Sequence, residues 1–142
     1  MIRAIFIMFA IFVGMQFFQT EKTNPQTDSS LEIQTPQNIK NLLRAGCYDC
    51  HSNETKWPSY SYIAPISWSV ASHVEEGRNA LNFSIWETYS GEQKQKHLKE
   101  IFRTVYASMP LTSYIAFHPE ADFSKEQRKE IRDWVLSLGV QP

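Results

Sequence analysis

One pentapeptide, Cys47-Tyr-Asp-Cys50-His51, constrains the fold of this 142-residue chain more than any other feature. Two thiols three positions apart, followed at once by a histidine, form the sequence pattern to which a c-type haem is attached. On a helical segment Cys47 and Cys50 lie about one turn apart, so both sulfurs can reach the two vinyl groups on one edge of a porphyrin. His51 then supplies a neutral imidazole nitrogen to the iron as its proximal ligand. The motif therefore predicts one covalently held haem c as cofactor.

Competing interpretations of the motif are few because Cys47 and Cys50 are the only cysteines in the sequence. A structural zinc site generally needs four Cys or His ligands, and no second pair at matching spacing occurs. A thioredoxin-like redox pair needs a strand and a helix around the cysteines. Here a helical pattern precedes Cys47, and a loop rich in proline and aromatic residues follows the motif. A protein without haem, holding a plain disulfide or a redox dithiol, stays as the alternative.

An apolar run distinguishes residues 1–19 from the rest of the sequence. After Arg3, the residues from Ala4 to Phe18 carry no charge, and Gln16 is the single interruption. A basic start followed by such a run is typical of an export signal. No small-x-small cleavage site follows, and the run approaches the lower limit of about 17 residues for a spanning helix. We therefore expect a retained membrane anchor in preference to a cleaved signal peptide.

The composition then changes to that of a tether followed by a domain. Residues 20–35 are rich in Thr, Gln, Asn, Ser and Pro, which predicts a flexible linker with little to bury. Residues 36–142 form the expected folded domain. Because a domain of this size has a limited apolar core, a covalent porphyrin would add substantially to it.

Helical periodicity dominates the folded part and predicts an all-α domain. Ser124 and Gln127 form a capping box in front of an apolar stripe that ends at Gly139. The helix in the middle of the domain is expected to be capped by Ser67 or its neighbour. The expected helices cover residues 36–45, 67–79, 91–108 and 124–138.

Four further side chains are candidates for contacts with the porphyrin or for structural roles. Trp57 or Trp68 would donate its N–H to a propionate, or would pack in the core. Arg78 would pair with a propionate, or would be a solvated charge near a helix end. His97 falls among lysines and is expected to be exposed to solvent.

Met109 is the expected distal ligand of the iron. It lies on the inner face of a helix that Pro110 must end. A thioether presented from such a break supplies the sixth iron ligand in class I cytochromes c, and it favours a raised redox potential. His118 is the main competitor, followed by His73. An open sixth position, with Met109 filling the core, is the remaining possibility.

Several motifs together resemble one known family. They are Cys47-Tyr-Asp-Cys50-His51-Ser-Asn-Glu-Thr, Trp57-Pro58, Ala64-Pro65-Ile66-Ser67-Trp68, Glu76-Gly77-Arg78, Leu81-Asn82-Phe83-Ser84-Ile85-Trp86, Met109-Pro110 and His118-Pro119-Glu120-Ala121. From about residue 38 to 139 the chain is similar to the bacterial haem-binding domain family, small exported proteins with one CxxCH. The resemblance implies one haem c held covalently by Cys47 and Cys50, with His51 on the iron. It leaves the distal ligand open, because Met109 and His118 both lie in matching motifs.

The expected function is electron transfer outside the cytoplasm. We expect a small all-α, cytochrome c-like domain around one haem, preceded by an N-terminal hydrophobic helix, on the periplasmic side of a bacterial inner membrane. It would be an electron carrier and not an enzyme, with redox proteins at the membrane as partners. The net charge of −1 gives no argument for nucleic acid as a partner. The alternative function is a peroxidase-like haem enzyme or gas sensor whose sixth iron position is open or displaceable.

Overall fold

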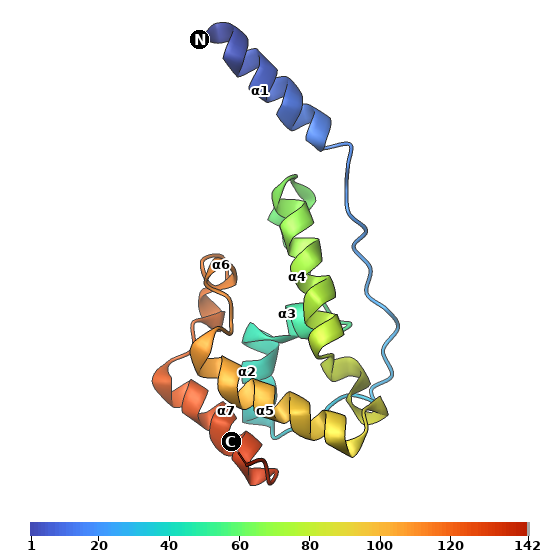
Figure 1. Ribbon diagram of the computed structural model, residues 1–142, viewed down its shortest axis with the longest axis vertical. Coiled ribbons are helices and arrows are strands. Elements are labelled where there is room, and N and C mark those ends of the chain that lie inside the picture. The colour runs from blue at the N-terminus through green and yellow to red at the C-terminus, as the bar shows by residue number, and fades with distance from the viewer. Residues whose placement is uncertain (142) are drawn as a thin grey trace.

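The computed structural model describes residues 1–141, whose regular structure is entirely helical (Figure 1). The predicted all-α fold class is thereby confirmed for the described residues. Seven segments of this range are α-helices and three are 3-10 helices. In chain order they are α1 (Ile2–Met15), α2 (Gln37–Gly46), α3 (Tyr48–His51), η1 (Ser59–Tyr62), α4 (Ile66–Ala80), η2 (Phe83–Thr88), α5 (Gly91–Ala107), α6 (Thr112–Ile115), η3 (Pro119–Ala121) and α7 (Lys125–Ser137).

Local capping signals start helices α5 and α7. The predicted capping box before α7 is confirmed: the Ser124 hydroxyl accepts from the Gln127 backbone N–H, and the Gln127 side chain accepts from the Ser124 backbone N–H. Ser90 and Gln93 make the same reciprocal pair before α5. Beyond α7, Gly139 adopts a φ of +80°, a left-handed conformation that favours glycine and ends the helix.

Helix α4 starts differently from the expected capping by Ser67. Its N-cap residue is Pro65, and no side chain there makes a capping hydrogen bond. Ser67 lies inside the first turn and is fully buried. The expected serine cap is therefore wrong, because the chain enters the helix two residues earlier.

Helices α2, α5 and α7 enclose the apolar core, and α5 and α7 run side by side in Figure 1. Leu43 of α2 and Ile131 and Val135 of α7 are almost completely shielded from solvent. They pack in one cluster with Leu98 and Phe102 of α5. Truncating such a side chain to alanine typically costs about 2–5 kcal/mol of stability. This core supports the segment that carries the two cysteines.

The packed domain begins earlier in the sequence than Pro36. Ile33 is only 2% exposed, and its backbone N–H donates to the carbonyl of Phe83 in η2 at 3.0 Å. The Glu87 N–H donates to the Leu31 carbonyl at 2.9 Å. The end of the segment expected to be a flexible linker therefore pairs with η2. Its burial depends on a partner some fifty residues away, which composition cannot show.

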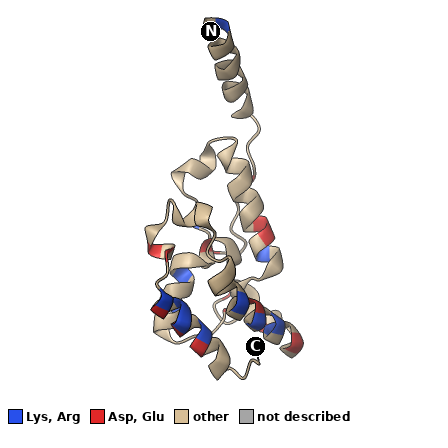
Figure 2. Ribbon diagram, turned by 60° about the vertical axis from the view of Figure 1, so that its left-hand side comes forward, with Lys and Arg blue, Asp and Glu red and all other residues tan. Residues whose placement is uncertain are grey.

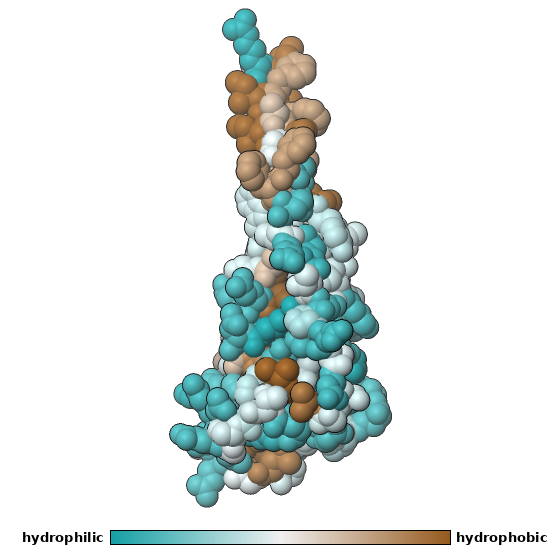
Figure 3. All heavy atoms as spheres, turned by 90° about the vertical axis from the view of Figure 1, so that its right-hand side faces the viewer, coloured by the Kyte–Doolittle hydropathy of each residue, from teal (hydrophilic) through white to brown (hydrophobic). Residues whose placement is uncertain are grey.

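Helix α1 projects away from the packed domain (Figures 1 and 3). It contains no buried residue, and its large apolar side chains are exposed all round it. Among residues 1–141, no helix combines the length and the apolar character needed to cross a membrane.

Candidate functional site

The two cysteines lie on the helical turn that the sequence predicts. Cys47 ends α2 and is the N-cap of the four-residue helix α3. The Cys50 N–H donates to the Cys47 carbonyl at 3.2 Å, and the His51 N–H donates to the same carbonyl at 2.9 Å. Both cysteines are free thiols. The pentapeptide therefore presents two reduced sulfurs about one turn apart.

A buried acidic residue holds the second residue of the pentapeptide in place. Glu32 is only 8% exposed and accepts a hydrogen bond from the Tyr48 hydroxyl at 2.8 Å. It also pairs with Lys40 at 2.6 Å and with Arg44 at 3.2 Å. Tyr48 stacks on Phe83, with ring centroids 5.2 Å apart. These contacts fix α3 against α2 and η2.

Helix α4 crosses directly over the pentapeptide at Gly77. A Cβ atom added to Gly77 would lie 2.4 Å from the backbone oxygen of Cys50, a separation that real Cβ atoms do not show. A glycine is needed because of this close approach. Its absent side chain lets the carbonyls of Gly77 in α4 and of Leu81, the C-cap of α4, reach the ring of His51.

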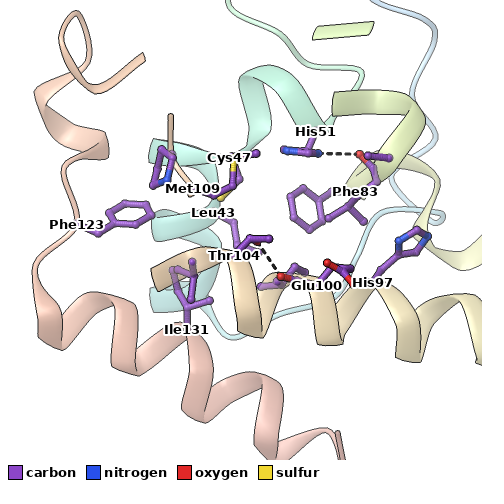
Figure 4. Close-up of a pocket in the computed structure, with 16 residues that line it drawn as sticks. Leu43, Cys47, His51, Phe83, His97, Glu100, Thr104, Met109, Phe123 and Ile131 are labelled. Atoms are coloured by element: carbon purple, nitrogen blue, oxygen red, sulfur yellow. Dashed lines mark hydrogen bonds between the residues drawn. The ribbon is translucent and has the colours of Figure 1, made fainter. Parts of the chain in front are cut away.

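The ring of His51 is oriented by two backbone carbonyls. Its Nδ1 lies 2.9 Å from the Gly77 oxygen and 3.1 Å from the Leu81 oxygen; Figure 4 shows the second contact. Because carbonyls only accept, Nδ1 carries the proton and Nε2 keeps a free lone pair. Burial lowers the pKa of His51, against the opposing effect of these hydrogen bonds. The imidazole is thus neutral and has one nitrogen ready to bind a metal.

Both thiols are protonated at neutral pH. Burial, followed by the nearby Cys50, raises the pKa of Cys47 to about 12. Burial and the negative charge of Asp49 raise the pKa of Cys50 to about 11. A catalytic dithiol depends on a lowered thiol pKa, so this environment disfavours the alternative of a thiol–disulfide enzyme.

Two neighbouring cavities lie against His51 of the pentapeptide, and a third borders Asp49 and Cys50. The first has a volume of about 210 Å³ and is lined by Cys47; the second has a volume of about 360 Å³ and is lined by Cys50. His51 and Met109 line both cavities. The apolar side chains that line the first cavity are Leu43, Leu81, Phe83, Ile101, Val105, Phe123 and Ile131.

These residues fit a covalently attached haem. Two reduced thiols on one helical turn, a neutral imidazole with a free nitrogen and a largely apolar wall meet at one place. Figure 4 shows Cys47, His51 and Met109 along one side of the first cavity, with Glu100 and Thr104 of α5 opposite. Apolar surroundings and a fixed imidazole are the means by which a protein holds and tunes haem iron.

Met109 is the predicted distal residue that shares both cavities with His51. Its backbone N–H donates to the Thr104 carbonyl at 2.9 Å, and its own carbonyl accepts from Arg128 Nη1 at 2.8 Å. These bonds hold the chain at the end of α5. His73 of α4 lines the second cavity but not the first.

His118 lies apart from the two cavities. Its ring stacks on Tyr114, with centroids 4.1 Å apart and planes 7° from parallel. Nε2 lies 2.7 Å from the Tyr60 hydroxyl, and Nδ1 lies 3.3 Å from a carboxylate oxygen of Glu120. Both ring nitrogens therefore already have partners.

His97 is a cavity residue that the sequence analysis missed. It is half-buried, lines the first cavity and packs against Tyr89 with ring centroids 4.6 Å apart. Burial and the charge of Lys96 lower its pKa. The expectation that it is exposed is wrong, because it lies one turn before the buried Ile101 on the same face of α5. That spacing was the available signal.

Arg78 and the two tryptophans do not face the cavities. Arg78 Nη1 donates to the Thr23 carbonyl at 2.9 Å, and Nη2 donates to Asn24 Oδ1 at 2.9 Å. Its remaining donors bind Ser52 and Thr55, so the guanidinium ties the linker to α4 and to the loop after the pentapeptide. Trp57 and Trp68 line a separate hollow beside the linker.

Comparison with known proteins gives two matches. The sequence model of the family described as a haem-binding domain matches residues 10–137. Cytochrome c peroxidase Ccp of Escherichia coli (strain K12) is 25% identical over 134 residues, which is 90% of this chain and 29% of that protein. The chain thus spans less than a third of the length of this curated relative. No solved structure matches.

Proposed function

The chain belongs to the haem-binding domain family, and from this premise we propose that it is a monohaem c-type cytochrome that carries single electrons outside the cytoplasm. The observation that supports this most directly is the fixed ring of His51. Its Nδ1 is held by Gly77 and Leu81, and the ring lines the same cavities as Met109. In this proposal Cys47 and Cys50 hold the haem through thioether bonds, and His51 binds its iron.

The bound haem supplies reversible one-electron chemistry. The chain's own residues set the conditions for it. The carbonyls on Nδ1 of His51 increase the basicity of the ligating nitrogen and prevent rotation of the ring. Leu43, Phe83 and Ile131 give the first cavity an apolar lining. Met109 serves as the distal ligand, and its thioether favours a raised potential.

The proposed location is the periplasmic side of a bacterial inner membrane. The support is the uncharged, apolar segment from Ala4 to Phe18 behind Arg3, which suits a membrane anchor or, alternatively, a cleaved export signal. Retention at the membrane would raise the effective concentration of the domain near membrane-bound redox partners. The linker around Thr23 and Asn24, tied down by Arg78, limits how far the domain can move from that surface.

A second candidate function is a peroxidase-like enzyme or a gas sensor. The name of the relative from Escherichia coli favours it. That match covers only 29% of the relative, so most of the peroxidase lies outside the part similar to this chain. This partial coverage is consistent with a module that delivers electrons and does not carry out the whole peroxidase reaction. Met109, which lines both cavities with His51, is placed to fill the sixth position of the iron. Electron transfer therefore remains the first proposal.

An absorption spectrum of the purified, matured full chain separates these functions. It is recorded in the oxidised and the reduced state, with and without carbon monoxide. An electron carrier with His51 and Met109 as ligands gives a low-spin spectrum that carbon monoxide leaves unchanged. A high-spin oxidised spectrum with rapid carbon monoxide binding on reduction would instead establish the second candidate. A colourless chain would contradict both.

A further inference from the structure

Four large apolar side chains gather at the end of the domain that faces α1. Tyr62, Ile63, Ile66 and Phe117, here called the apolar tip, are 56%, 46%, 47% and 64% exposed. They come from η1, from the start of α4 and from the residues after α6. Ile66 and Phe117 line one hollow together with Tyr60, so the two segments are in contact. A gathered, exposed apolar patch of this kind marks an interaction surface, unlike single exposed residues.

The apolar tip is free of charge. Residues 59–68 and 111–117, which form it, contain no Asp, Glu, Lys or Arg. In the ribbon of Figure 2, most of the charged positions lie on the part of the domain away from α1. The hollow beside the tip is bordered by Asp49 and Lys56 from neighbouring segments. The two tip segments themselves add no ionised side chain that contact with an apolar phase would have to bury.

The end of α1 is fastened to the apolar tip. Gln16 bridges to the backbone of Ala64: its Nε2 donates to the carbonyl at 3.1 Å, and its Oε1 accepts from the N–H at 3.0 Å. Trp68 Nε1 donates to the Phe18 carbonyl at 2.6 Å. Lys22 lies over the ring of Tyr62, 4.8 Å from its centroid. The exposed apolar surface of α1 and the apolar tip therefore lie next to each other.

The chemistry of α1 indicates what covers both surfaces. A helix that is apolar all round requires apolar surroundings on every side. Tyr62 and Trp68 have the amphipathic rings that are enriched at the boundary between lipid and water. The Lys22 ammonium over the ring of Tyr62 suits the headgroup layer, where long basic side chains extend.

We propose that the apolar tip lies on a lipid bilayer, so that the domain has one fixed orientation on the membrane surface. This inference rests on the proposed membrane association of residues 1–19. Tyr62, Ile66 and Phe117 contact the headgroup and upper acyl region, and α1 enters the same bilayer. The opposite end of the domain, where Leu136 and Leu138 are exposed at the end of α7, points into water.

Quenching of tryptophan fluorescence by lipid tests this orientation. The matured full chain is reconstituted into vesicles of phosphatidylcholine and phosphatidylglycerol that contain lipids spin-labelled close to the headgroup. Subtracting the signal of a Trp68→Phe variant isolates Trp68 from the other three tryptophans. We expect the spin-labelled lipids to quench the Trp68 component.

A tip variant and a matched control decide whether the apolar tip contributes. The substitutions Tyr62→Ser, Ile66→Ser and Phe117→Ser should reduce the quenching of Trp68 at least twofold, while flotation with the vesicles persists through α1. Leu136→Ser with Leu138→Ser, also exposed but at the far end, should leave quenching unchanged. If the triple variant does not fold, Phe117→Ser alone replaces it, with a smaller expected decrease.

Equal quenching of Trp68 in the wild type and the tip variant would overturn the inference and leave the proposed electron transfer intact. Loss of flotation by the wild type would overturn the inference together with the proposed anchor. The haem spectrum of the same sample reports separately on the proposed cofactor. If the apolar tip binds a protein surface instead of lipid, Trp68 should be quenched equally in the wild type and the tip variant, because α1 alone would then hold the chain on the vesicle.

Discussion

The Nδ1 nitrogen of His51 lies 2.9 Å from the backbone oxygen of Gly77. Helix α3, which carries His51, is only four residues long and is too short to be stable by itself. A carbonyl of the longer helix α4 therefore determines the direction of the ring. The close approach depends on the missing side chain at position 77, so a glycine outside the pentapeptide is part of the candidate site.

Gly77→Ala should damage the site without altering any proposed ligand. The new Cβ would overlap the Cys50 backbone oxygen and push α4 away from α3. We expect the free energy of unfolding to fall by about 1–3 kcal/mol, the usual cost of overpacking. The haem spectrum should also change, because Nδ1 of His51 loses its fixed acceptor. Denaturant unfolding followed by circular dichroism, together with the absorption spectrum, measures both effects.

Gly91→Ala is the matched control for that experiment. Apart from its chain neighbours and the backbone of its own helix, no atom lies within 4 Å of a Cβ built on Gly91, which starts α5. This variant should keep the unfolding midpoint and the spectrum of the wild type. Indistinguishable behaviour of Gly77→Ala and Gly91→Ala would contradict the role assigned to the crossing of α4 over the pentapeptide.

Met109→Ala should convert the low-spin spectrum to a high-spin one, lower the redox potential and permit carbon monoxide binding. The reason is that Met109 lines both cavities with His51, so its removal leaves the proposed sixth position without a ligand. His118→Ala should leave the spectrum unchanged, since both nitrogens of His118 already have partners away from the cavities. An unchanged spectrum in Met109→Ala, with a spectral change in His118→Ala or His73→Ala, would show that Met109 is the wrong ligand.

Glu32→Gln should reduce stability in a pH-dependent way. Burial of Glu32 alone would raise its pKa, but hydrogen bonds from Lys40 and Tyr48 and the charges of Lys40 and Arg44 lower the pKa below its ordinary value of 4.5. The unfolded chain therefore binds the proton more readily, and the stabilisation is present above pH 4.5 and disappears as the pH falls through the folded-state pKa. We expect a loss of about 1–3 kcal/mol at pH 7.

Urea unfolding of wild type and Glu32→Gln over a series of pH values measures this effect. The difference in unfolding free energy between the two proteins should shrink as the solution is acidified. The exposed Glu75 provides the control, because Glu75→Gln should change stability little at any pH. A difference between wild type and Glu32→Gln that stays constant down to low pH would contradict the assignment.

Arg78→Lys should loosen the linker while the domain stays folded. The compact ammonium group of lysine lacks the planar fork of N–H donors with which Arg78 binds Thr23 and Asn24 at the same time. We expect the free energy of local opening of the linker to fall by about 1 kcal/mol. A protease that acts on the open state should then cleave the linker about fivefold faster. Limited proteolysis with mass analysis of the fragments gives the rate. The control is Arg103→Lys, at an exposed position on α5, which should be cleaved at the wild-type rate. Equal cleavage rates for both variants would contradict the role of Arg78 in holding the linker.

Features coded by neighbouring residues were predictable from the sequence. The capping box of Ser124 and Gln127 needs only four consecutive positions, and the structure has it. The same holds for the helical turn from Cys47 to His51 and for the end of α5 just before Met109. In each of these places neighbouring residues define where the helix starts, turns or ends, although the short α3 also needs its packing against α4 to be stable.

Features that depend on distant partners were not predictable. Glu32 is buried because Lys40, Arg44 and Tyr48 surround it after folding, whereas composition placed it in a polar linker. The spacing of His97 to Ile101 indicates that it is shielded, but its place in the first cavity depends on residues from other segments, among them Cys47 and Phe83. Tertiary packing overrides local character at both residues.

The mass of the matured, denatured chain tests the central claim most directly. Addition of the Cys47 and Cys50 S–H groups across two vinyl groups loses no atoms, so the account predicts the mass of the chain plus one complete haem after expression in a host that assembles c-type cytochromes. Cys47→Ala together with Cys50→Ala should abolish the gain. A wild-type chain that comes out with the mass of the bare polypeptide would contradict the claim.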